Sequence, residues 1–246
     1  MENNGWALVT GGSRGLGYES ARGLANRGFN VGLLARDPQR LRDAKESLTS
    51  EFPQNSFETF AVDLETLTPS HEIFNEIKNE IGTPQTLILA HGVMSEKMSK
   101  TLRTSLQEWR RVMSINLDSV FTLVNAIVPS MVEARNGRVI IYSACLGRMS
   151  GPGNTGGLAP YRVSKSGVNA LVRNLAHETG LGARGILVDA VCPNHSQTDM
   201  GGPDAPRSAQ EGAATAIWLA TRDFDARSEH PDVTGVLWED QEVIPW

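Results

Sequence analysis

Residues 10–17 read TGGSRGLG and follow directly after the short apolar run Ala7–Val9. A helical pattern begins within this stretch, so its glycines occupy a turn between a strand and a helix. Glycines let such a turn close tightly and approach a pyrophosphate, while the helix N-terminus carries partial positive charge. An ordinary glycine-rich turn is the alternative to a dinucleotide site. The predicted dinucleotide contacts are Gly11, Ser13, Arg14, Gly15, Leu16 and Gly17.

Short β-branched runs alternate with longer helical patterns along the chain, which is typical of βαβ units around a parallel sheet. The expected strands are Ala7–Thr10, Asn30–Leu34, Phe57–Val62, Thr86–Ala90, Arg138–Ser143, Ile186–Val191 and Gly235–Trp238. The expected helices are Leu16–Asn26, Gln39–Ser50, Pro69–Ile81, Leu106–Arg135, Pro160–Thr179 and Ser208–Thr221. The pattern predicts an α/β fold: one Rossmann-type, doubly wound parallel sheet of about seven strands with helices on both faces. We expect one domain over residues 1–246.

Composition narrows the function classes. The formal net charge of -5 argues against nucleic-acid or anionic-membrane partners, which attract clustered Lys and Arg. No stretch approaches eighteen consecutive apolar residues, and the start of the chain lacks the basic and apolar regions of a signal peptide. We therefore expect a cytoplasmic protein that acts on a small molecule.

Cys145 and Cys192 are the two cysteines of the chain. Both lie in apolar, strand-like surroundings, and their spacing matches neither a metal site nor a redox motif. The sequence predicts two buried thiols, with no disulfide and no metal site.

The residue after the second strand indicates which nucleotide binds, because ligands of open parallel sheets lie beyond the carboxyl ends of the strands. An NAD enzyme would place an acid there to bind the ribose hydroxyls, whereas this chain has Arg36 after Ala35. Together with Arg14, this guanidinium predicts a site for a 2′-phosphate and hence NADP(H). The alternative is two solvated arginines, with Asp37 neutralising Arg36 or serving as the acid.

Residues 161–165 read YRVSK and open an apolar helix. The four-residue spacing places the Tyr161 phenol and the Lys165 ammonium on one helix face. A tyrosine, with an ordinary pKa of about 10, becomes a useful acid or base near neutral pH when a cation stabilises its phenolate. The same spacing also arises by chance in helices, so the context must support this interpretation.

The glycine turn, the Tyr-x-x-x-Lys helix and the chain length together resemble the short-chain dehydrogenase/reductase family over nearly the whole chain. The resemblance implies an NADPH-dependent oxidoreductase that moves a hydride to or from the carbon of a ketone, an aldehyde or the corresponding alcohol. It also implies that Tyr161 protonates the carbonyl oxygen, that Lys165 lowers the pKa of the phenol and binds the ribose, and that a serine steadies the substrate oxygen.

Further positions match the family. Asn116 matches the helix asparagine whose backbone holds a proton-relaying water, although it could instead cap a helix irregularity. Thr198 matches the threonine that contacts the nicotinamide carboxamide, and residues 244–246, IPW, are similar to the ends of carbonyl reductase-like members. Asp63 is expected to accept from the adenine amino group or to cap a helix. The remaining predicted cofactor contacts are Arg36, Leu64, Ala90, His91, Gly92, Tyr161, Lys165, Pro193 and Asn194.

Two segments depart from the family pattern. The family's Asn-Asn-Ala-Gly is LAHG at residues 89–92, so its sheet-bridging asparagine is missing and an imidazole, His91, replaces a small residue beside the cofactor. His91 could contact the ribose, bind substrate or have a structural role. The family's Pro-Gly is Pro193-Asn194, and asparagine is the non-glycine residue that best tolerates positive φ. We expect the backbone turn to survive this change.

The catalytic serine is the third departure. The expected strand ends in Ser143, and ungapped alignment puts Ala144 where the family has its catalytic serine. Side chains alternate along a strand, so Ser143 could take this role only through a bulge or a one-residue slip. We assign it the role, with Ser150, Thr155 or no residue as alternatives.

The oligomeric state, the reaction class and the substrate are less closely determined by the sequence. Family members usually pair the helices near residues 106–135 and Tyr161, so a homodimer or homotetramer is expected. Rival functions are a non-redox member of the fold, such as a dehalogenase, dehydratase or cyclase, and a catalytically altered NADP(H)-binding protein. Substrate identity depends on the loops at Met94, 146–158 and 199–207, whose conformations the pattern does not give.

Overall fold

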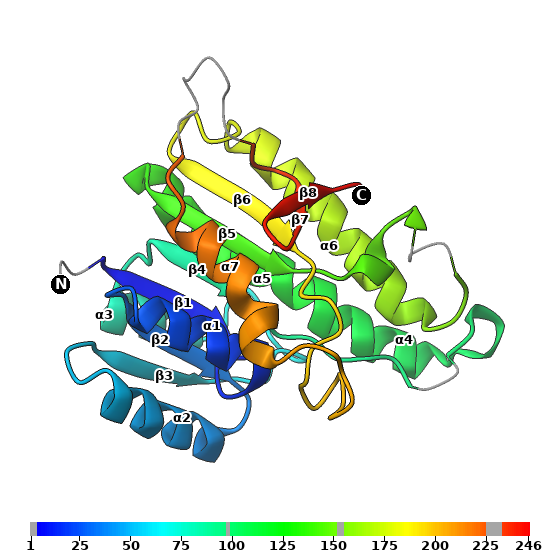
Figure 1. Cartoon of the computed structure of the whole chain (residues 1–246), viewed down its shortest axis with the longest axis horizontal. Helices are drawn as coiled ribbons and strands as arrows, with labels where there is room; N and C mark the ends of the chain where they lie inside the picture. Colours follow the sequence, from blue (N-terminus) through cyan, green and yellow to red (C-terminus); the bar gives the residue numbers. More distant parts are fainter. Residues whose placement is uncertain (1–3, 97–98, 152–154, 225–232) are drawn as a thin grey trace.

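A computed structural model describes residues 4–96, 99–151, 155–224 and 233–246 and contains one eight-stranded sheet (Figure 1). Its strand order is β3-β2-β1-β4-β5-β6-β7-β8. The strands are β1 (Trp6–Thr10), β2 (Asn30–Ala35), β3 (Phe57–Ala61), β4 (Thr86–Leu89), β5 (Gly137–Tyr142), β6 (Ile186–Val191), β7 (Leu237–Glu239) and β8 (Glu242–Ile244). All neighbouring pairs are parallel except β7 with β8. The order reverses between β1 and β4, which is where ligands of doubly wound sheets bind.

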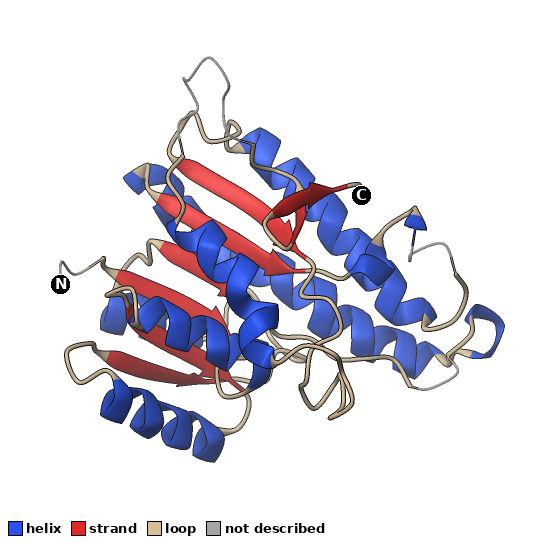
Figure 2. Cartoon of the chain, in the orientation of Figure 1, coloured by secondary structure: helices blue, strands red, loops and turns tan. Residues whose placement is uncertain are grey.

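Helices cover both faces of the sheet (Figure 2). On one face lie α1 (Gly15–Ala25), α2 (Pro38–Glu51) and α7 (Ala209–Thr221). On the other lie α3 (Ile73–Ile81), α5 (Ser119–Ala134) and α6 (Ala159–Glu178), and α4 (Leu106–Met113) contacts α6. The predicted doubly wound α/β architecture is therefore confirmed.

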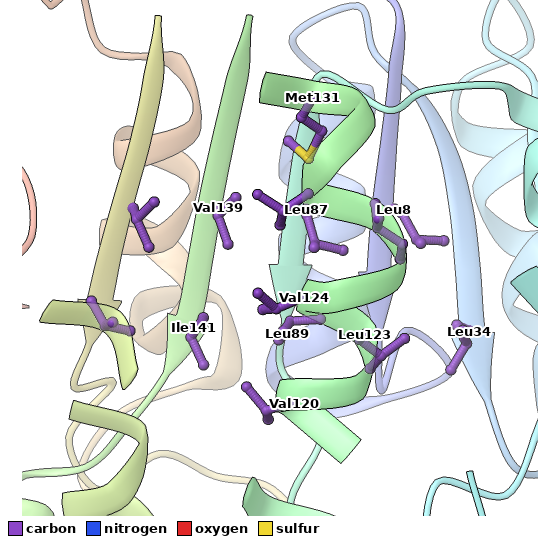
Figure 3. Close-up of a cluster of buried hydrophobic side chains, with 14 of the residues drawn as sticks. Leu8, Leu34, Leu87, Leu89, Val120, Leu123, Val124, Met131, Val139 and Ile141 are labelled. Atoms are coloured by element: carbon purple, nitrogen blue, oxygen red, sulfur yellow. The ribbon is translucent and has the colours of Figure 1, made fainter. Parts of the chain in front are cut away.

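The sheet is buried on both faces, which explains why its strands read as continuous apolar runs. In β4, Leu87 and Leu89 pack toward α5, while Ile88 between them packs in the cluster on the opposite face. Figure 3 shows Leu123 and Val124 of α5 lying against the strands, in the cluster that also contains Leu87 and Leu89. This rigid centre fixes the carboxyl ends of the strands, where the candidate site lies.

The helix expected over residues 106–135 is interrupted. Residues 114–118 form a π-helix turn, so α4 and α5 are separate helices on either side of it. By length and composition Leu106–Ala134 could cross a membrane, with a mean hydropathy of 1.4, but half of that window is buried inside the protein. A core helix passes the same test, because the apolar side of α5 packs on the sheet.

Two further features of the fold differ from the sequence-based expectations. The short strand β8 was not predicted, because three residues carry too little pattern to mark a strand. The prediction of two unpaired thiols was wrong: Cys145 and Cys192 form a disulfide with a Cα–Cα distance of 5.8 Å. They are 47 residues apart in sequence, but they follow the neighbouring strands β5 and β6, so the sheet brings them together.

Candidate active site

The glycine turn between β1 and α1 has the tight geometry that the sequence predicts. Gly11 and Gly15 adopt positive φ values of 66° and 56°, which glycine takes without steric cost. A Cβ on Gly17 would lie 2.3 Å from the Gly11 carbonyl oxygen, so only glycine fits where the helix packs against the turn. Ser13 and Leu16 are partly buried in this turn, and Arg14 is its exposed N-cap residue.

Three guanidinium groups gather beside this turn. The positive charges of Arg40 and Arg36, together with partial burial as the largest cause, lower the pKa of Arg14. Arg36 and Arg40 are exposed at the end of β2 and in the first turn of α2. The carboxylate of Asp37 is the N-cap of α2 and accepts from the backbone N–H groups of Gln39 and Arg40. Asp37 therefore serves as a helix cap, and the cluster can hold a multivalent anion.

Asp63 and Leu64 follow β3 and lie at the same edge of the sheet. One carboxylate oxygen of Asp63 accepts from the Glu65 backbone N–H at 3.0 Å, which is the local capping geometry that the sequence left open. Leu64 is buried in the core cluster beneath α3 and α5. Neither contact tests the predicted adenine role.

Tyr161 and Lys165 lie in the first turns of α6 and are both buried. Lys165 Nζ lies 6.0 Å from the centre of the Tyr161 ring and donates to the Tyr142 carbonyl oxygen at 2.7 Å. Burial lowers the pKa of Lys165 to about 8 and raises the pKa of Tyr161 to about 12. Burial thus shifts both pKa values, and for Tyr161 it acts against the lowering by Lys165 that the family resemblance implies.

Asn116 joins this pair from the π-helix turn. Its Oδ1 accepts from Val93 N–H at 2.8 Å, and its Nδ2 donates to the Val93 carbonyl oxygen and to Ser164 Oγ. Ser164 in turn donates to the carbonyl oxygen of Tyr161. A Cβ on Gly92 would lie 3.4 Å from Asn116 Oδ1 and 3.6 Å from Lys165 Nζ. The segment after β4, the π-turn and α6 therefore meet at one point.

His91 lies in a continuous chain of hydrogen bonds. Ala90 N–H donates to Thr10 Oγ1, and His91 Nδ1 lies 2.6 Å from this hydroxyl. His91 Nε2 lies 2.8 Å from Ser119 Oγ, which donates to the Ile115 carbonyl oxygen. Because the Ser119 hydroxyl already donates its proton, it must accept from His91 Nε2. The Thr10 hydroxyl is left to donate to Nδ1, so the ring is neutral and protonated at Nε2. Burial, followed by the charge of Lys165, lowers the pKa of His91 to about 3.

The structure gives Ser143 no bulge or slip at the end of β5. The pairing of β5 with β6 is regular to Tyr142, and Ser143 N–H continues it by donating to the Val191 carbonyl oxygen. The Ser143 hydroxyl donates to Asn169 Oδ1 in α6 and lies 3.4 Å from the Lys165 carbonyl oxygen. Its side chain is thereby engaged with α6, while Ala144 follows in extended conformation.

The segment after β6 adopts the backbone turn expected for Pro193-Asn194. Asn194 has a positive φ of 58°, which supports the expectation that asparagine can replace the family's glycine. Thr198 lies against the glycine turn, since a Cβ on Gly15 would be 3.2 Å from its methyl carbon. Of the predicted pocket loops, residues 152–154 lie outside the described residues.

Sequence reasoning missed two groups of residues at this edge. Arg40 lies in the first turn of α2, four residues after Arg36, and the Asp-Pro start of that helix could have indicated its place. Asn169 and Ser164 hold the strand end and the π-turn onto α6, and no local pattern marks them because their partners are distant in sequence.

Comparison with known proteins places this chain in a family. A family model described as short chain dehydrogenase matches residues 5–208. The 3-oxoacyl-[acyl-carrier-protein] reductase FabG of Staphylococcus epidermidis is 32% identical over 196 residues, covering 79% of this chain and 76% of that protein. FabG of Chlamydia trachomatis is 29% identical, covering 80% and 76%.

Solved structures share the fold. A short chain dehydrogenase from Salmonella enterica superposes with a TM-score of 0.84 at 23% identity, covering 98% of this chain and 97% of that one. A short chain dehydrogenase from Shigella flexneri, complexed with NADP, gives 0.82 at 22% identity and covers 96% of each chain. From the match over residues 5–208 and the FabG relative, the chain belongs to the short-chain dehydrogenase family of oxidoreductases.

Proposed function

We propose that the protein is an NADP(H)-dependent reductase of a ketone or aldehyde, or oxidises the corresponding alcohol. The observation that carries this proposal is the convergence of Tyr161, Lys165 and Asn116, all buried, at the edge of the sheet that also bears the glycine turn. A phenol beside a buried ammonium is suited to exchange a proton with a carbonyl oxygen.

The cofactor proposal rests on the fit between the glycine turn and a dinucleotide. The turn leaves no room for side chains at Gly17, which suits close approach of backbone to a pyrophosphate. Arg14, Arg36 and Arg40 supply the cations that a 2′-phosphate requires, and guanidinium groups bind phosphate in a bidentate manner. When bound, NADPH supplies the hydride. The NADP complex of the Shigella flexneri relative is consistent with this choice.

The protein's own side chains supply the proton. With a pKa raised by burial, Tyr161 is protonated at neutral pH and can donate its proton to a carbonyl oxygen that gains negative charge. Lys165 keeps two N–H donors beyond its bond to the Tyr142 carbonyl, and its ammonium stabilises the phenolate that remains. Asn116 holds the π-turn, whose altered backbone bonding can free a carbonyl oxygen for a water.

The substrate class follows the relatives. FabG relatives are named as 3-oxoacyl reductases, so a ketone on an acyl chain is the first candidate. Ser143 remains the proposed contact to the substrate oxygen, and to serve there its hydroxyl must leave Asn169. If it does not, the phenol alone orients the carbonyl, since the side chain of Ala144 offers no donor.

The test is NADPH oxidation with a panel of ketones and aldehydes that includes a 3-oxoacyl thioester. Consumption of NADPH that requires Tyr161 supports the reductase. Tight NADPH binding without consumption would instead favour a catalytically altered binding protein, for which Ala144 and the engaged Ser143 hydroxyl are the favouring observations. Turnover of another substrate without nucleotide would point to non-redox chemistry.

We also propose that the chain forms a homo-oligomer through α5 and α6. Phe121 on α5 and Val163 on α6 are 55% and 44% exposed, so each of these helices offers an apolar side chain to a second copy of the chain. A homodimer or homotetramer would cover both. Light scattering should give at least twice the chain mass, and Phe121→Glu should reduce it to that of the monomer.

The expected compartment remains the cytoplasm, and the disulfide provides a test. Reducing compartments keep most cysteine pairs as thiols. We therefore expect the disulfide between Cys145 and Cys192 to be reduced in protein that is alkylated rapidly from such cells, and to form again on exposure to oxidant. Quantitative disulfide after rapid alkylation would contradict the cytoplasmic assignment.

A further inference from the structure

The loop that follows β6 folds over the glycine turn between β1 and α1 (Figure 1). Contact between Thr198 and Gly15 brings the two segments together. Beyond Thr198 the chain turns back at once, since Thr198 Oγ1 accepts from Gly201 N–H at 3.0 Å and its carbonyl oxygen accepts from Gly202 N–H at 2.8 Å. This turn presents the side chain of Asp199 to the residues after β1.

Asp199 lies against the arginine cluster. Its carboxylate forms an ion pair with Arg14, and the same oxygen, Oδ2, lies 3.9 Å from Arg40. The side chain of Asp199 is 68% exposed and that of Arg14 is 53% exposed, so water and other anions can reach both. The charges of Arg40 and Arg36 repel that of Arg14. The carboxylate of Asp199 attracts Arg14 and Arg40 and so opposes part of this repulsion.

We propose that Asp199 occupies the anion site that the 2′-phosphate of NADP(H) takes, and that it thereby sets the preference between NADPH and NADH. The proposal rests on the NADP(H) assignment above. In the nucleotide-free protein the carboxylate of Asp199 pairs with Arg14 and lies beside Arg40, so it offsets one of their two positive charges. Binding of NADP(H) exchanges this internal anion for the phosphate.

The exchange has a clear direction. A phosphate monoester carries close to two negative charges at neutral pH and offers three acceptor oxygens, whereas Asp199 offers one charge. An ion pair between exposed side chains is weak, so the phosphate can displace it. NADH lacks this phosphate and leaves the pair of Asp199 with Arg14 intact. Asp199 therefore competes with NADPH and not with NADH.

The competition also reaches the nicotinamide end. Asp199 follows Thr198 directly, and Thr198 is the predicted contact to the carboxamide. Release of Asp199 from Arg14 removes an ion pair between this turn and the glycine turn, where Thr198 contacts Gly15. The phosphate at one end of the nucleotide can thus adjust the loop that meets the other end.

The test compares Asp199→Asn with Asp204→Asn, which removes the same charge from an exposed position on the same loop. Dissociation constants are measured at low salt by titration calorimetry for NADPH, NADH, 2′,5′-ADP and 5′-AMP. We expect Asp199→Asn to bind NADPH and 2′,5′-ADP about threefold more tightly than the unaltered protein, the size typical of one exposed ion pair. NADH and 5′-AMP should bind unchanged, and Asp204→Asn should differ little from the unaltered protein.

Each other outcome has a defined meaning. If the unaltered protein prefers NADPH but Asp199→Asn binds it no more tightly than Asp204→Asn, the role of Asp199 fails and the cofactor assignment stands. If the unaltered protein binds NADPH and NADH equally, the 2′-phosphate site is absent and both proposals fail. High salt should remove the difference between the variants, because the competing pair is exposed.

Discussion

The two ends of the candidate nucleotide site hold charge in opposite ways. At the phosphate end, the guanidinium groups of Arg36 and Arg40 are exposed to solvent. At the proton-transfer end, Lys165 is 4% exposed, and burial lowers its pKa to about 8. An exposed charge attracts anions and is screened by salt. The charge of a buried group depends on pH, because burial and neighbouring groups shift its pKa. One end can therefore select the nucleotide while the other governs the proton.

The largest expected effect comes from removing the proton donor. Tyr161→Phe should lower turnover by about 10²–10⁴-fold, the usual contribution of a positioned acid. Its dissociation constant for NADPH should change little, because the ring still fills the same buried place. Steady-state NADPH oxidation and fluorescence titration measure the two quantities. A Phe variant that keeps full turnover would remove the phenol from the mechanism.

Loss of a phosphate-binding cation should be smaller and confined to binding. Arg36→Ala should weaken NADPH binding about tenfold to a hundredfold, as expected for one charge-assisted contact, and leave NADH binding unchanged. Arg42→Ala is the matched control, because Arg42 is exposed on α2 and bonds to Gln39. Equal losses for the two nucleotides would show that Arg36 acts elsewhere than at a 2′-phosphate.

The sequence predicted those features of the site that depend on neighbouring residues, and missed those that depend on contacts between distant segments. The glycine turn, the Tyr161–Lys165 spacing and Arg36 were predictable because each is decided within a few residues by backbone or helix geometry. The disulfide between Cys145 and Cys192 was not, since it depends on which strands become neighbours. The bonds of Asn169 to the end of β5 depend on tertiary packing in the same way.

The lowered pKa of Lys165 predicts an upper pH limit for carbonyl reduction. The Lys165 ammonium is present below its pKa of about 8 and is lost above it, while Tyr161 stays protonated up to about 12. The kcat/KM for carbonyl reduction should therefore fall as pH rises through about 8, approaching tenfold per pH unit. Lys165→Arg should move this limb upward, because a guanidinium keeps its proton. An unchanged limb in that variant would assign the ionisation to another group.

The ionisation of Lys165 also affects folding. Its pKa in the folded protein lies below the ordinary value of 10.5, so the unfolded chain binds more protons between about 8 and 10.5. The free energy of unfolding should then rise with pH over that window. Urea denaturation at several pH values measures this, with Lys165→Met as the control that lacks the dependence.

The smallest expected effect on turnover concerns His91. Its ring links Thr10 and Ser119 near Lys165, and we do not expect it to transfer a proton in the reaction. His91→Leu removes the hydrogen bonds to Thr10 and Ser119 and should cost about 2 kcal/mol of stability at neutral pH, while turnover changes by less than about threefold. His195→Leu is the control, because His195 is exposed and bonds only within its own loop to Gly201 in the described part of the chain.

The pH dependence of the same variant separates a structural imidazole from one that contacts the nucleotide. The folded pKa of His91 is about 3, below its ordinary value of 6.5, so the unfolded chain takes up the proton first as pH falls. The unaltered protein should lose stability below pH 6.5, by about 1.4 kcal/mol per pH unit at most, and His91→Leu should not. The two proteins should therefore approach equal stability near pH 5. If His91→Leu instead keeps full stability at neutral pH and loses NADPH affinity, the imidazole contacts the cofactor, as the sequence first suggested.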